Sequence, residues 1–444
     1  MRGAIAAGHP LTAEAGARVL AGGGNAIDAC IAAAFVAGVA EGPLTGPAGG
    51  GFLLVAEPGG DAVLLDCFFA VPTRPLGAME EAIVDFADAG TQVFHVGEGS
   101  VAVPGLVAGL EEAHRRFGAH PWAELVEPAI ALALEGVVRD QPRAFLHGVL
   151  GGILLRTDAG ARIYGDPERV VTAEFATTLR SIRDDGASAV GGLLPELSAD
   201  LAAYRVLEHS PLESEILGQR VLVTPVPSRG GEIVLEILAS LESLDHWSLH
   251  GEARAVALAY ERSWPGTISG TTHISVVDAE GRVAALSSTL GSGSGVFRGS
   301  TQLNNMLGEL DVIGAAPRAP GERLPSMMTP TLVLEGDRPR LVLGSAGSVR
   351  LAGAIAQVTW RILQGEGVAA AIEAPRLHVD GATLHLEGGW PVEAAAALPE
   401  SWDVVRWENL NLFFGGVQAV ARTPDGGLEA AGDPRRGGAG LVVS

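Results

Sequence analysis

The chain is poor in positive charge. Its 444 residues contain 30 Lys and Arg against 52 Asp and Glu, which gives a formal net charge of −22. Nucleic acids and anionic membranes attract proteins through a cationic surface, and this composition does not supply one. We therefore expect no nucleic-acid partner and no membrane partner.

Cysteines and long apolar segments are also scarce. Cys30 and Cys67 are the 2 cysteines, and neither belongs to a CxxC pair, so we expect no disulfide framework and no structural zinc site. The longest apolar run, 29–40, is too short to span a bilayer and predicts a buried helix. The segment MRGAIAAGHPLTAEAG (1–16) lacks the sustained apolar stretch of a signal peptide, which favours a cytoplasmic location.

Several familiar catalytic motifs are missing as well. The sequence has no GxSxG, which removes the ordinary serine-hydrolase interpretation, and its histidines form no HExxH pair. The glycine-rich segment GPAGGG (46–51) lacks the lysine and Ser/Thr of a phosphate-binding loop. We expect no metal and no cofactor.

The sequence is rich in apolar residues, at 47%, and only 18% of its residues are charged, which is typical of a globular protein with a large core. Periodicity and turn signals predict an α+β layered protein. Helices are expected within 10–40 (with Thr12 and Asn25 as N-caps), 101–138, 350–366 and 368–373, and strands at 43–55, 62–66, 219–224, 272–278, 282–290, 330–335 and 340–344.

The segment SGTTHISVVDAEGRVAALSSTLGSGSG (269–295) predicts a β-hairpin with an unusual opening. Asp278 and Gly281 are expected at the ends of the tight turn, which places Thr289 opposite the Gly270–Thr271 junction. Threonine is a good strand former, so the two threonines after Ser-Gly could be ordinary strand residues. Their position at the mouth of a hairpin also allows a catalytic interpretation.

A threonine hydroxyl becomes a good nucleophile when its own α-amino group acts as the base, which requires an N-terminal threonine. Thr271 would acquire that amine only after cleavage of the Gly270–Thr271 bond. Its own hydroxyl could perform this cleavage by attacking the preceding carbonyl, and Thr289 would be placed to orient that hydroxyl.

TTHISVVDAEG (271–281), followed by LNN (303–305), resembles the γ-glutamyltranspeptidase family, whose small subunit begins at the first threonine of such a TTH. Further similarities follow in the family's order: AAGHPLTAEAGARVLAGGGNAIDACIAAAFVAGVAEG (6–42), GPAGGGFLL (46–54), VPGLVAGLEEAHRRFG (103–118), TPVPSRGG (224–231), PSMMTPTLVL (325–334), GSAGSVR (344–350) and EAPRLH (373–378). The resemblance implies a four-layer αββα N-terminal-nucleophile (Ntn) hydrolase fold. It also implies a precursor that cuts itself into residues 1–270 and 271–444, which stay together as one intertwined domain; further dimerisation is left open.

The same resemblance implies roles for individual residues. Thr271 would be the nucleophile and, through its new amine, the general base, while Thr289 would support it. Gly347 and Ser348 match the glycine pair whose backbone amides form the oxyanion hole. A serine at the second position still supplies an amide, provided that its backbone adopts the angles of a glycine.

The substrate-binding positions depart from the family. Gly291, Met306 and Glu309 stand where the family holds the γ-glutamyl amino group with Asn, Gln or Glu, and Asp. The paired serines that bind the α-carboxylate become Ser326 and Met327. Two further residues complete the expected substrate contacts: Asn305 of the LNN motif, and Arg74 as the carboxylate-binding arginine.

These features predict a self-processing amidohydrolase or acyltransferase that cleaves a small-molecule amide or peptide, γ-glutamyl or related, through an acyl-enzyme. The family's activity would place it in glutathione metabolism. Three alternatives remain open at this stage: glutathione hydrolysis with an altered amino-group site, a cephalosporin-acylase-like amidase on a non-glutamyl acyl group, and a non-catalytic, unprocessed relative. The residues do not decide between hydrolysis and transfer.

Overall fold

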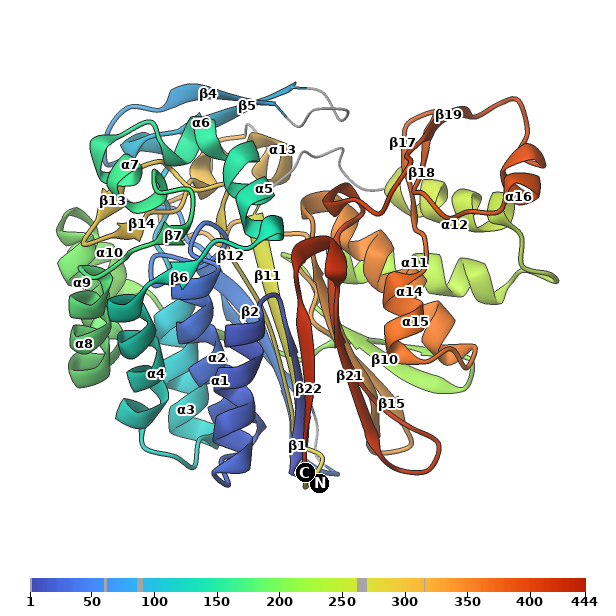
Figure 1. The fold of residues 1–444 in the computed structure, drawn as a ribbon, viewed down its shortest axis with the longest axis horizontal. Helices are drawn as coiled ribbons and strands as arrows, with labels where there is room; N and C mark the ends of the chain where they lie inside the picture. Colours follow the sequence, from blue (N-terminus) through green and yellow to red (C-terminus); the bar gives the residue numbers. More distant parts are fainter. Residues whose placement is uncertain (1, 60–61, 86–90, 262–269, 315) are drawn as a thin grey trace.

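A computed structural model of the chain describes residues 2–59, 62–85, 91–261, 270–314 and 316–444 (Figure 1). It is an α+β protein in which two β-sheets lie face to face between two groups of helices. Within the described residues, every helix is too short or too polar to cross a bilayer.

The larger sheet has seven strands in the order β22-β1-β11-β12-β2-β3-β8. The central hairpin β11–β12 lies between β1 and β2, which come from the N-terminal part of the chain, and all neighbours in these pairs are antiparallel. Segments from both sides of Gly270 therefore share one hydrogen-bonded sheet. The strands are β1 Gly3–Ala7, β2 Gly50–Ala56, β3 Ala62–Cys67, β8 Leu207–His209, β11 Gly270–Asp278, β12 Val283–Gly291 and β22 Ala439–Val443.

The second sheet has six strands in the order β21-β20-β16-β15-β10-β9. Its strands β16 and β20 lie against β11 of the larger sheet. The strands are β9 Leu212–Ile216, β10 Gln219–Val223, β15 Thr331–Glu335, β16 Arg338–Ala346, β20 Gly416–Arg422 and β21 Leu428–Gly432.

Helices cover the outer face of each sheet, on the left and on the right in Figure 1. The helices on the larger sheet's side are α1 Pro10–Ala21, α2 Ala26–Ala40, α3 Leu106–Phe117, α4 Trp122–Glu135 and α8 Phe175–Asp185. Those on the smaller sheet's side are α11 Gly230–Glu242, α12 Leu249–Glu261, α14 Leu351–Leu363 and α15 Val368–Glu373. The arrangement is helix, sheet, sheet, helix.

Short elements close the ends of these layers. The helical ones are η2 Glu98–Ser100, α5 Gln141–Val149, α6 Gly151–Leu154, α7 Asp158–Tyr164, η3 Gly186–Ala189, α9 Val190–Leu193, η4 Pro195–Leu197, α10 Ser198–Ala203, η5 Met306–Gly308, α13 Leu310–Ile313, η6 Ser348–Arg350, α16 Val392–Ala396, η7 Leu412–Phe414 and η8 Pro434–Arg436. The strands are β4 Glu80–Asp85, β5 Thr91–Val96, β6 Val137–Val138, β7 Arg169–Val170, β13 Phe297–Arg298, β14 Thr301–Gln302, β17 Leu377–Asp380, β18 Thr383–Leu386 and β19 Asp403–Arg406.

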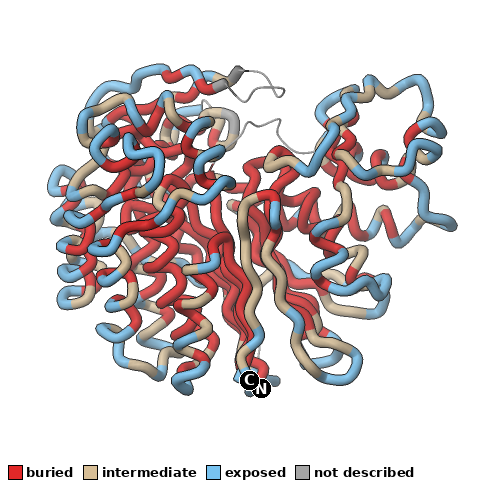
Figure 2. The backbone as a smooth tube through the Cα atoms, in the orientation of Figure 1, coloured by how far each residue is buried: buried red, intermediate tan, exposed pale blue. Residues whose placement is uncertain are grey.

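Strand β2 shows how the sequence produces these layers. Side chains alternate along a strand, and here both sets are apolar. Phe52 and Leu54 belong to the core between the two sheets, whereas Leu53 and Val55 belong to the core beneath the helices. A strand that is buried on both faces must be apolar throughout, which explains the GGFLLVA run and the buried central strands in Figure 2.

The structure confirms the predicted hairpins and most element positions, with one corrected helix cap. Asn25 caps α2 as predicted, and Asp28 completes its capping box. Thr12 does not cap α1: the helix begins at Pro10, and the N-cap is His9, whose Nδ1 accepts the N–H of Leu11. Proline suits a first helical position, so the helix begins two residues before Thr12.

Candidate active site

Thr271 lies at the start of β11 and is 2% exposed. Gly270 pairs with Gly291 and Thr272 with Ser288, so between these pairs β12 has one residue more than β11. From Thr272 onward along β11, each paired residue meets a β12 residue one position later than predicted. The expected contact still forms: the Thr289 hydroxyl donates to the Gly270 carbonyl, and the Gly291 N–H donates to Thr289 Oγ1 at 2.8 Å. Thr289 therefore meets the Gly270–Thr271 junction through its side chain.

Gly270 allows the two strands to approach this closely. A Cβ at this position would lie 2.6 Å from the Gly291 carbonyl oxygen and 3.1 Å from Leu44 Cδ2. A side chain would push the hairpin apart and withdraw the Gly270 carbonyl from Thr289. The glycine before Thr271 is thus required by packing.

The turn after β16 holds the two predicted oxyanion-hole residues in glycine-like conformations. Gly347 has a φ of 132°, and Ser348 has a φ of 57°, in the left-handed region. A non-glycine residue pays about 1–2 kcal/mol for this conformation. Ser345 supports the turn, because its hydroxyl donates to the Ala346 carbonyl at 2.8 Å and accepts the Gly416 N–H at 3.2 Å. The condition set for Ser348, a glycine-like backbone, is met.

A small pocket brings together Thr271, Thr289, Ser326 and Ser348, all of which the sequence singled out. We call it the apolar pocket. Its other lining residues are hydrophobic: Phe68, Met306, Val312, Met327, Met328 and Leu351. The space within it, including that open to solvent, is about 310 Å³. Among the described lining residues, every polar side chain carries a hydroxyl and none is charged.

Ser326 lines the apolar pocket, and its contact with a substrate stays a prediction. Its Oγ accepts the Met328 N–H at 3.0 Å, and the Arg229 N–H donates to its carbonyl at 2.9 Å. These contacts fix the segment that carries Met327 and Met328 into the wall. A hydroxyl that accepts one hydrogen bond can still donate one to a ligand.

Asn305 and Glu309 do not line the apolar pocket and instead shape the turn after β12. Asn305 Oδ1 accepts the N–H groups of Ser292 and Gly293 at 2.7 and 3.1 Å, and Glu309 Oε1 accepts the N–H and the hydroxyl of Ser292, both at 2.9 Å. The Asn305 amide oxygen also fills the space that a side chain at Gly291 would need. The structure therefore gives both residues a role in shaping the turn, and their contact with a substrate stays a prediction.

Arg74 is exposed and lines neither of the two pockets that reach Thr271. Its neighbour Thr73 is held by Asp200, whose Oδ1 accepts the Thr73 N–H at 3.0 Å. The aromatic residue Phe68, directly after β3, lies in the apolar pocket instead. The role of Arg74 as the carboxylate-binding arginine stays a prediction.

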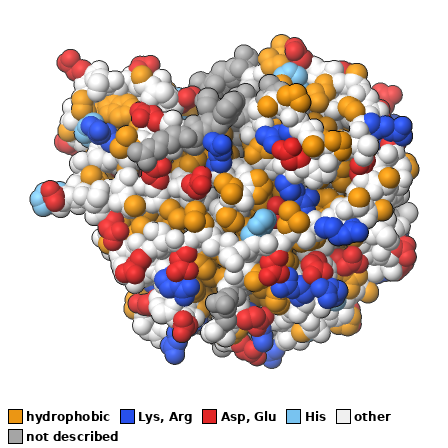
Figure 3. All heavy atoms as spheres, turned by 180° about the vertical axis from the view of Figure 1, so that it is seen from behind, with side chains coloured by type: hydrophobic (Ala, Val, Ile, Leu, Met, Phe, Trp, Pro, Cys, Tyr) orange, Lys and Arg blue, Asp and Glu red, His pale blue; other side chains and the backbone are white. Residues whose placement is uncertain are grey.

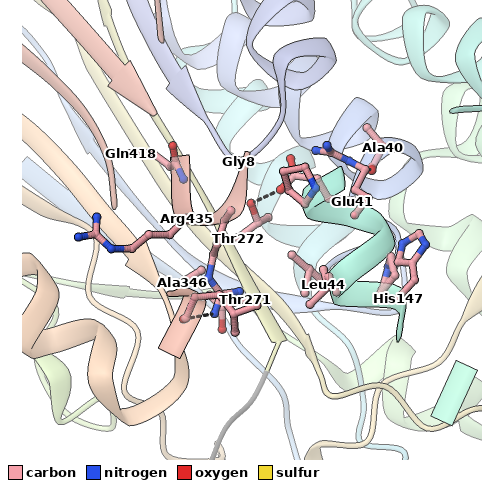
Figure 4. Close-up of a pocket in the computed structure, with 16 residues that line it drawn as sticks. Gly8, Ala40, Glu41, Leu44, His147, Thr271, Thr272, Ala346, Gln418 and Arg435 are labelled. Atoms are coloured by element: carbon pink, nitrogen blue, oxygen red, sulfur yellow. Dashed lines mark hydrogen bonds between the residues drawn. The ribbon is translucent and has the colours of Figure 1, made fainter. Parts of the chain in front are cut away.

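A second pocket borders Thr271, and we call it the arginine pocket. Its charged or ionisable lining residues are Glu41, Arg143, His147, Arg435 and Arg436, and it encloses about 540 Å³, including space open to solvent. Figure 4 shows Thr271 and Thr272 between Glu41, Leu44 and His147 on one side and Gln418 and Arg435 on the other. None of these charged residues was predicted as a site residue.

Glu41 is buried at the floor of the arginine pocket. Its carboxylate accepts the Thr12 hydroxyl at 2.7 Å and the Thr272 hydroxyl at 2.5 Å. Burial raises the pKa of the Glu41 carboxyl, while both hydroxyls and the nearby Arg143 and Arg436 act in the opposite direction. Glu41 thus ties α1 and α2 to the residue that follows Thr271. The sequence signal was a lone acid directly after the apolar run 29–40.

His273 has a structural role. It is fully buried, with Nδ1 2.8 Å from Ser287 Oγ and Nε2 2.9 Å from Ser275 Oγ. Burial lowers the pKa of its imidazole to about 3, so the ring is neutral at ordinary pH. Across the described ranges, no group of three or more His, Cys, Asp or Glu side chains is placed to hold a metal.

Comparison with known proteins places this geometry in a family. Residues 12–264 and 250–443 match the family model described as Gamma-glutamyltranspeptidase. The chain belongs to the γ-glutamyltranspeptidase family. It is 29% identical to the acylase ACY 1 proenzyme of Pseudomonas sp. strain SE83, over 100% of this chain and 94% of that protein. It is 26% identical to the glutathione hydrolase proenzyme of Bacillus subtilis strain 168, over 100% and 92%.

The solved cephalosporin acylase from Bacillus halodurans shares the fold, with a TM-score of 0.84 and 22% identity over 100% of this chain and 96% of that one. This similarity supports the layered architecture. It does not identify the substrate, which depends on the side chains at the site. Relatives with hydrolase and acylase names are both similar to this chain, so family membership alone does not identify the acyl group.

Proposed function

We propose that the protein is a self-processing N-terminal-threonine amidohydrolase of the Ntn hydrolase type, active after cleavage between Gly270 and Thr271. The observation that carries the proposal is the Thr289 hydroxyl, which donates to the Gly270 carbonyl beside Thr271 in a buried hairpin. That hydrogen bond polarises the carbonyl that the Thr271 hydroxyl must attack. The proenzyme relatives add support.

Cleavage proceeds in two steps. The Thr271 Oγ adds to the Gly270 carbonyl carbon, and the C–N bond breaks with a proton passing to the nitrogen, which leaves an ester between Gly270 and Thr271. Water then hydrolyses the ester to a Gly270 carboxylate and a free Thr271 amine. The resulting pieces, 1–270 and 271–444, stay associated because β1 lies between β22 and β11, and β12 pairs with β2, so strands of both pieces share the larger sheet.

In the mature enzyme the Thr271 amine takes the proton of its own hydroxyl, which attacks the substrate amide. The oxyanion is stabilised by the backbone N–H groups of Gly347 and Ser348, a type of contact that contributes about 100- to 1000-fold in rate. The amine leaves with a proton, and water or a second amine releases the acyl group from Thr271. Both hydrolysis and transfer are compatible with this sequence of steps.

The acyl group that suits the apolar pocket is uncharged and hydrophobic. A γ-glutamyl group carries an ammonium and a carboxylate, and the pocket offers them only hydroxyls among Phe68, Met306 and Met327. An ion buried without a partner costs several kcal/mol in proteins, about enough to exclude it from such a site. We therefore favour an acylase acting on an apolar acyl amide over a glutathione hydrolase.

Processing can be tested by denaturing electrophoresis of the purified wild type and of Thr271→Ala. We expect two fragments from the wild type and one full-length chain from the variant. Thr289→Ala, which removes the hydrogen bond to Gly270, should slow the appearance of the fragments. A wild-type chain that persists uncut would support the unprocessed, non-catalytic relative instead.

The acyl group can be tested with a panel of anilides that differ only in the acyl chain: hexanoyl, glutaryl, adipyl and γ-glutamyl. We expect kcat/KM to be greatest for hexanoyl, by about 100-fold or more over γ-glutamyl, because the charged groups lose hydration without gaining partners. Selective turnover of the γ-glutamyl anilide would overturn the acyl assignment and leave the processing proposal intact.

A further inference from the structure

Arg436 is a cation beside the oxyanion turn that the chemistry above does not use. It lines the arginine pocket together with Thr271. A Cβ built on Gly347 would lie 3.9 Å from Arg436 Nη2, so the guanidinium lies next to the predicted oxyanion hole. Its Nη2 makes one long contact, 3.4 Å, with the Leu412 carbonyl. The described residues provide no ion-pair partner for Arg436 and no hydrogen-bond acceptor for its buried Nε.

Other groups near Arg436 are also short of partners. His147 lines the same pocket and is 5% exposed, and its Nδ1 has no hydrogen-bond partner in the described part of the chain. Arg350, in the turn that follows Gly347, donates its Nε–H to the Phe413 carbonyl at 2.5 Å and leaves a buried Nη2 unsatisfied. Burial, and after it repulsion from Arg436, lowers the pKa of the Arg350 guanidinium to about 10.

Several arginines elsewhere on the molecule are paired with acids. Figure 3 shows acidic and basic side chains interspersed over one face. Arg115 pairs with Glu112 at 2.7 Å, and Arg298 with Glu196 at 2.6 Å. Within the arginine pocket itself, Arg435 pairs with Glu387 and Asp433, and Arg143 with Asp140. Arg436 is the lining arginine that has no ion pair among the described residues; nearby Asp433 and Glu41 attract its charge but leave its Nε without an acceptor.

We propose that Arg436 binds a carboxylate on the leaving amine, so that the preferred substrates are N-acylated amino acids. This rests on the proposed amidohydrolase function. In the intermediate, the amide carbon is bonded to Thr271 Oγ, to the acyl chain and to the amine. The acyl chain and the amine therefore point in different directions from Thr271. If the acyl chain fills the apolar pocket, the arginine pocket is the other space that borders Thr271.

An α-amino acid carries its carboxylate close to the scissile bond, one residue or about 4 Å after the scissile carbonyl. The guanidinium is also close to the predicted oxyanion turn, because a Cβ built on Gly347 would be 3.9 Å from Arg436 Nη2. A guanidinium can hold a carboxylate through two parallel hydrogen bonds. The neutral His147 imidazole can donate one more, and burial keeps the pKa of that ring at about 3.

The test compares N-hexanoylglycine with N-hexanoylglycinamide, which differ only in the carboxylate, by measuring the released amine. We expect the wild type to favour N-hexanoylglycine in kcat/KM by about 10- to 100-fold, the range for one charge-assisted contact. Arg436→Gln should bring the ratio close to one, mainly through KM, and Arg436→Lys should restore part of it. Arg18→Gln, an exposed arginine on α1, controls for the loss of one positive charge.

Each outcome separates the two proposals. If the wild type hydrolyses both substrates equally, the carboxylate site is wrong and the amidohydrolase stands. The same conclusion follows if Arg436→Gln is processed and keeps the wild-type ratio. If Arg436→Gln fails to fold, the wild-type ratio and its decrease with rising salt decide the question. An uncut wild type that hydrolyses neither substrate overturns both proposals.

Discussion

The two pockets that meet at Thr271 have opposite chemical character. The apolar pocket is lined by six hydrophobic side chains and four hydroxyls, whereas the arginine pocket contains Glu41, His147 and three arginines. An amide also has two unlike halves, and the carbon between them is attacked where the pockets join. Under the two proposals, the apolar pocket excludes charged acyl groups, and the arginine pocket attracts a negatively charged group on the amine.

The largest effect is expected at the turn between the two pockets. Gly347→Ala would put a Cβ 2.8 Å from Gly415 Cα, at a φ of 132° that L-residues rarely adopt. We expect the displaced amide to lower kcat for hexanoyl anilide by about 100- to 1000-fold. Ser348→Gly is the matched control, because it keeps the amide and relieves the left-handed strain, so kcat should change little. Wild-type kcat in a folded Gly347→Ala protein would remove the oxyanion assignment.

The second-largest effect is expected in the apolar pocket, where an added charge would reduce its chemical difference from the arginine pocket. Met327→Arg introduces a cation into the apolar pocket, where it can pair with a terminal carboxylate. We expect the kcat/KM ratio of adipyl to hexanoyl anilide to rise by about 10- to 100-fold. Met327→Leu keeps the pocket apolar and should preserve the wild-type ratio. No shift with Met327→Arg would mean that this pocket does not hold the acyl chain.

A smaller effect concerns stability and pH on the amine side. Burial lowers the pKa of His147 from 6.5 to about 3, so the folded protein holds it neutral. Its contribution to stability is present above pH 6.5 and is lost as the pH falls toward 3. His147→Gln should therefore reduce the pH dependence of the unfolding free energy by up to about 1.4 kcal/mol per pH unit in this window.

Denaturant titrations between pH 4 and 7 measure this slope. His246→Gln, at an exposed position, should leave it unchanged. Equal slopes for wild type and His147→Gln would show that His147 is solvated, which would also weaken its place in the arginine pocket.

The smallest effect is the contribution of Glu41 to the pH dependence of stability, which is opposite in sign to that of His147. Burial raises the pKa of Glu41, so the folded protein binds its proton more tightly than the unfolded chain does. Wild-type stability should fall relative to Glu41→Gln as the pH rises above 4.5, the ordinary value for this carboxyl. The hydroxyls of Thr12 and Thr272 limit the difference. Denaturant unfolding at pH 5 and 8 measures it, with Glu232→Gln as an exposed control; a difference that grows in the other direction would contradict the assignment.

Local patterns predicted much of this molecule. The β11–β12 hairpin, the Asn25 cap and the meeting of Thr289 with Gly270 all follow from residues close in sequence. The one-residue error in register came from a bulge that no turn signal marked. Thr12 was wrong as a cap. Its hydroxyl donates to the Glu41 carboxylate instead, a tertiary contact that the local sequence does not reveal.

Part of the pocket walls lay beyond such reasoning. The family resemblance pointed to Met306 and Met327, whereas Phe68 and Leu351 reach the apolar pocket from segments that no motif connected to it. Arg436 reaches Gly347 only because η8 packs beside β20. Arg74 stays a prediction for the same reason: a motif offset places a residue in sequence, while the direction of its side chain depends on the path of the chain after β3. Substrate residues therefore needed the three-dimensional arrangement.

The central claim is that Thr271 becomes an N-terminal nucleophile, and mass spectrometry of a quenched reaction tests it most directly. Purified protein mixed with hexanoyl anilide and stopped in acid should show the 271–444 fragment carrying one hexanoyl group on its N-terminal threonine. The 1–270 fragment should remain unmodified. An active full-length chain, or a hexanoyl group on any residue other than Thr271, would contradict the account.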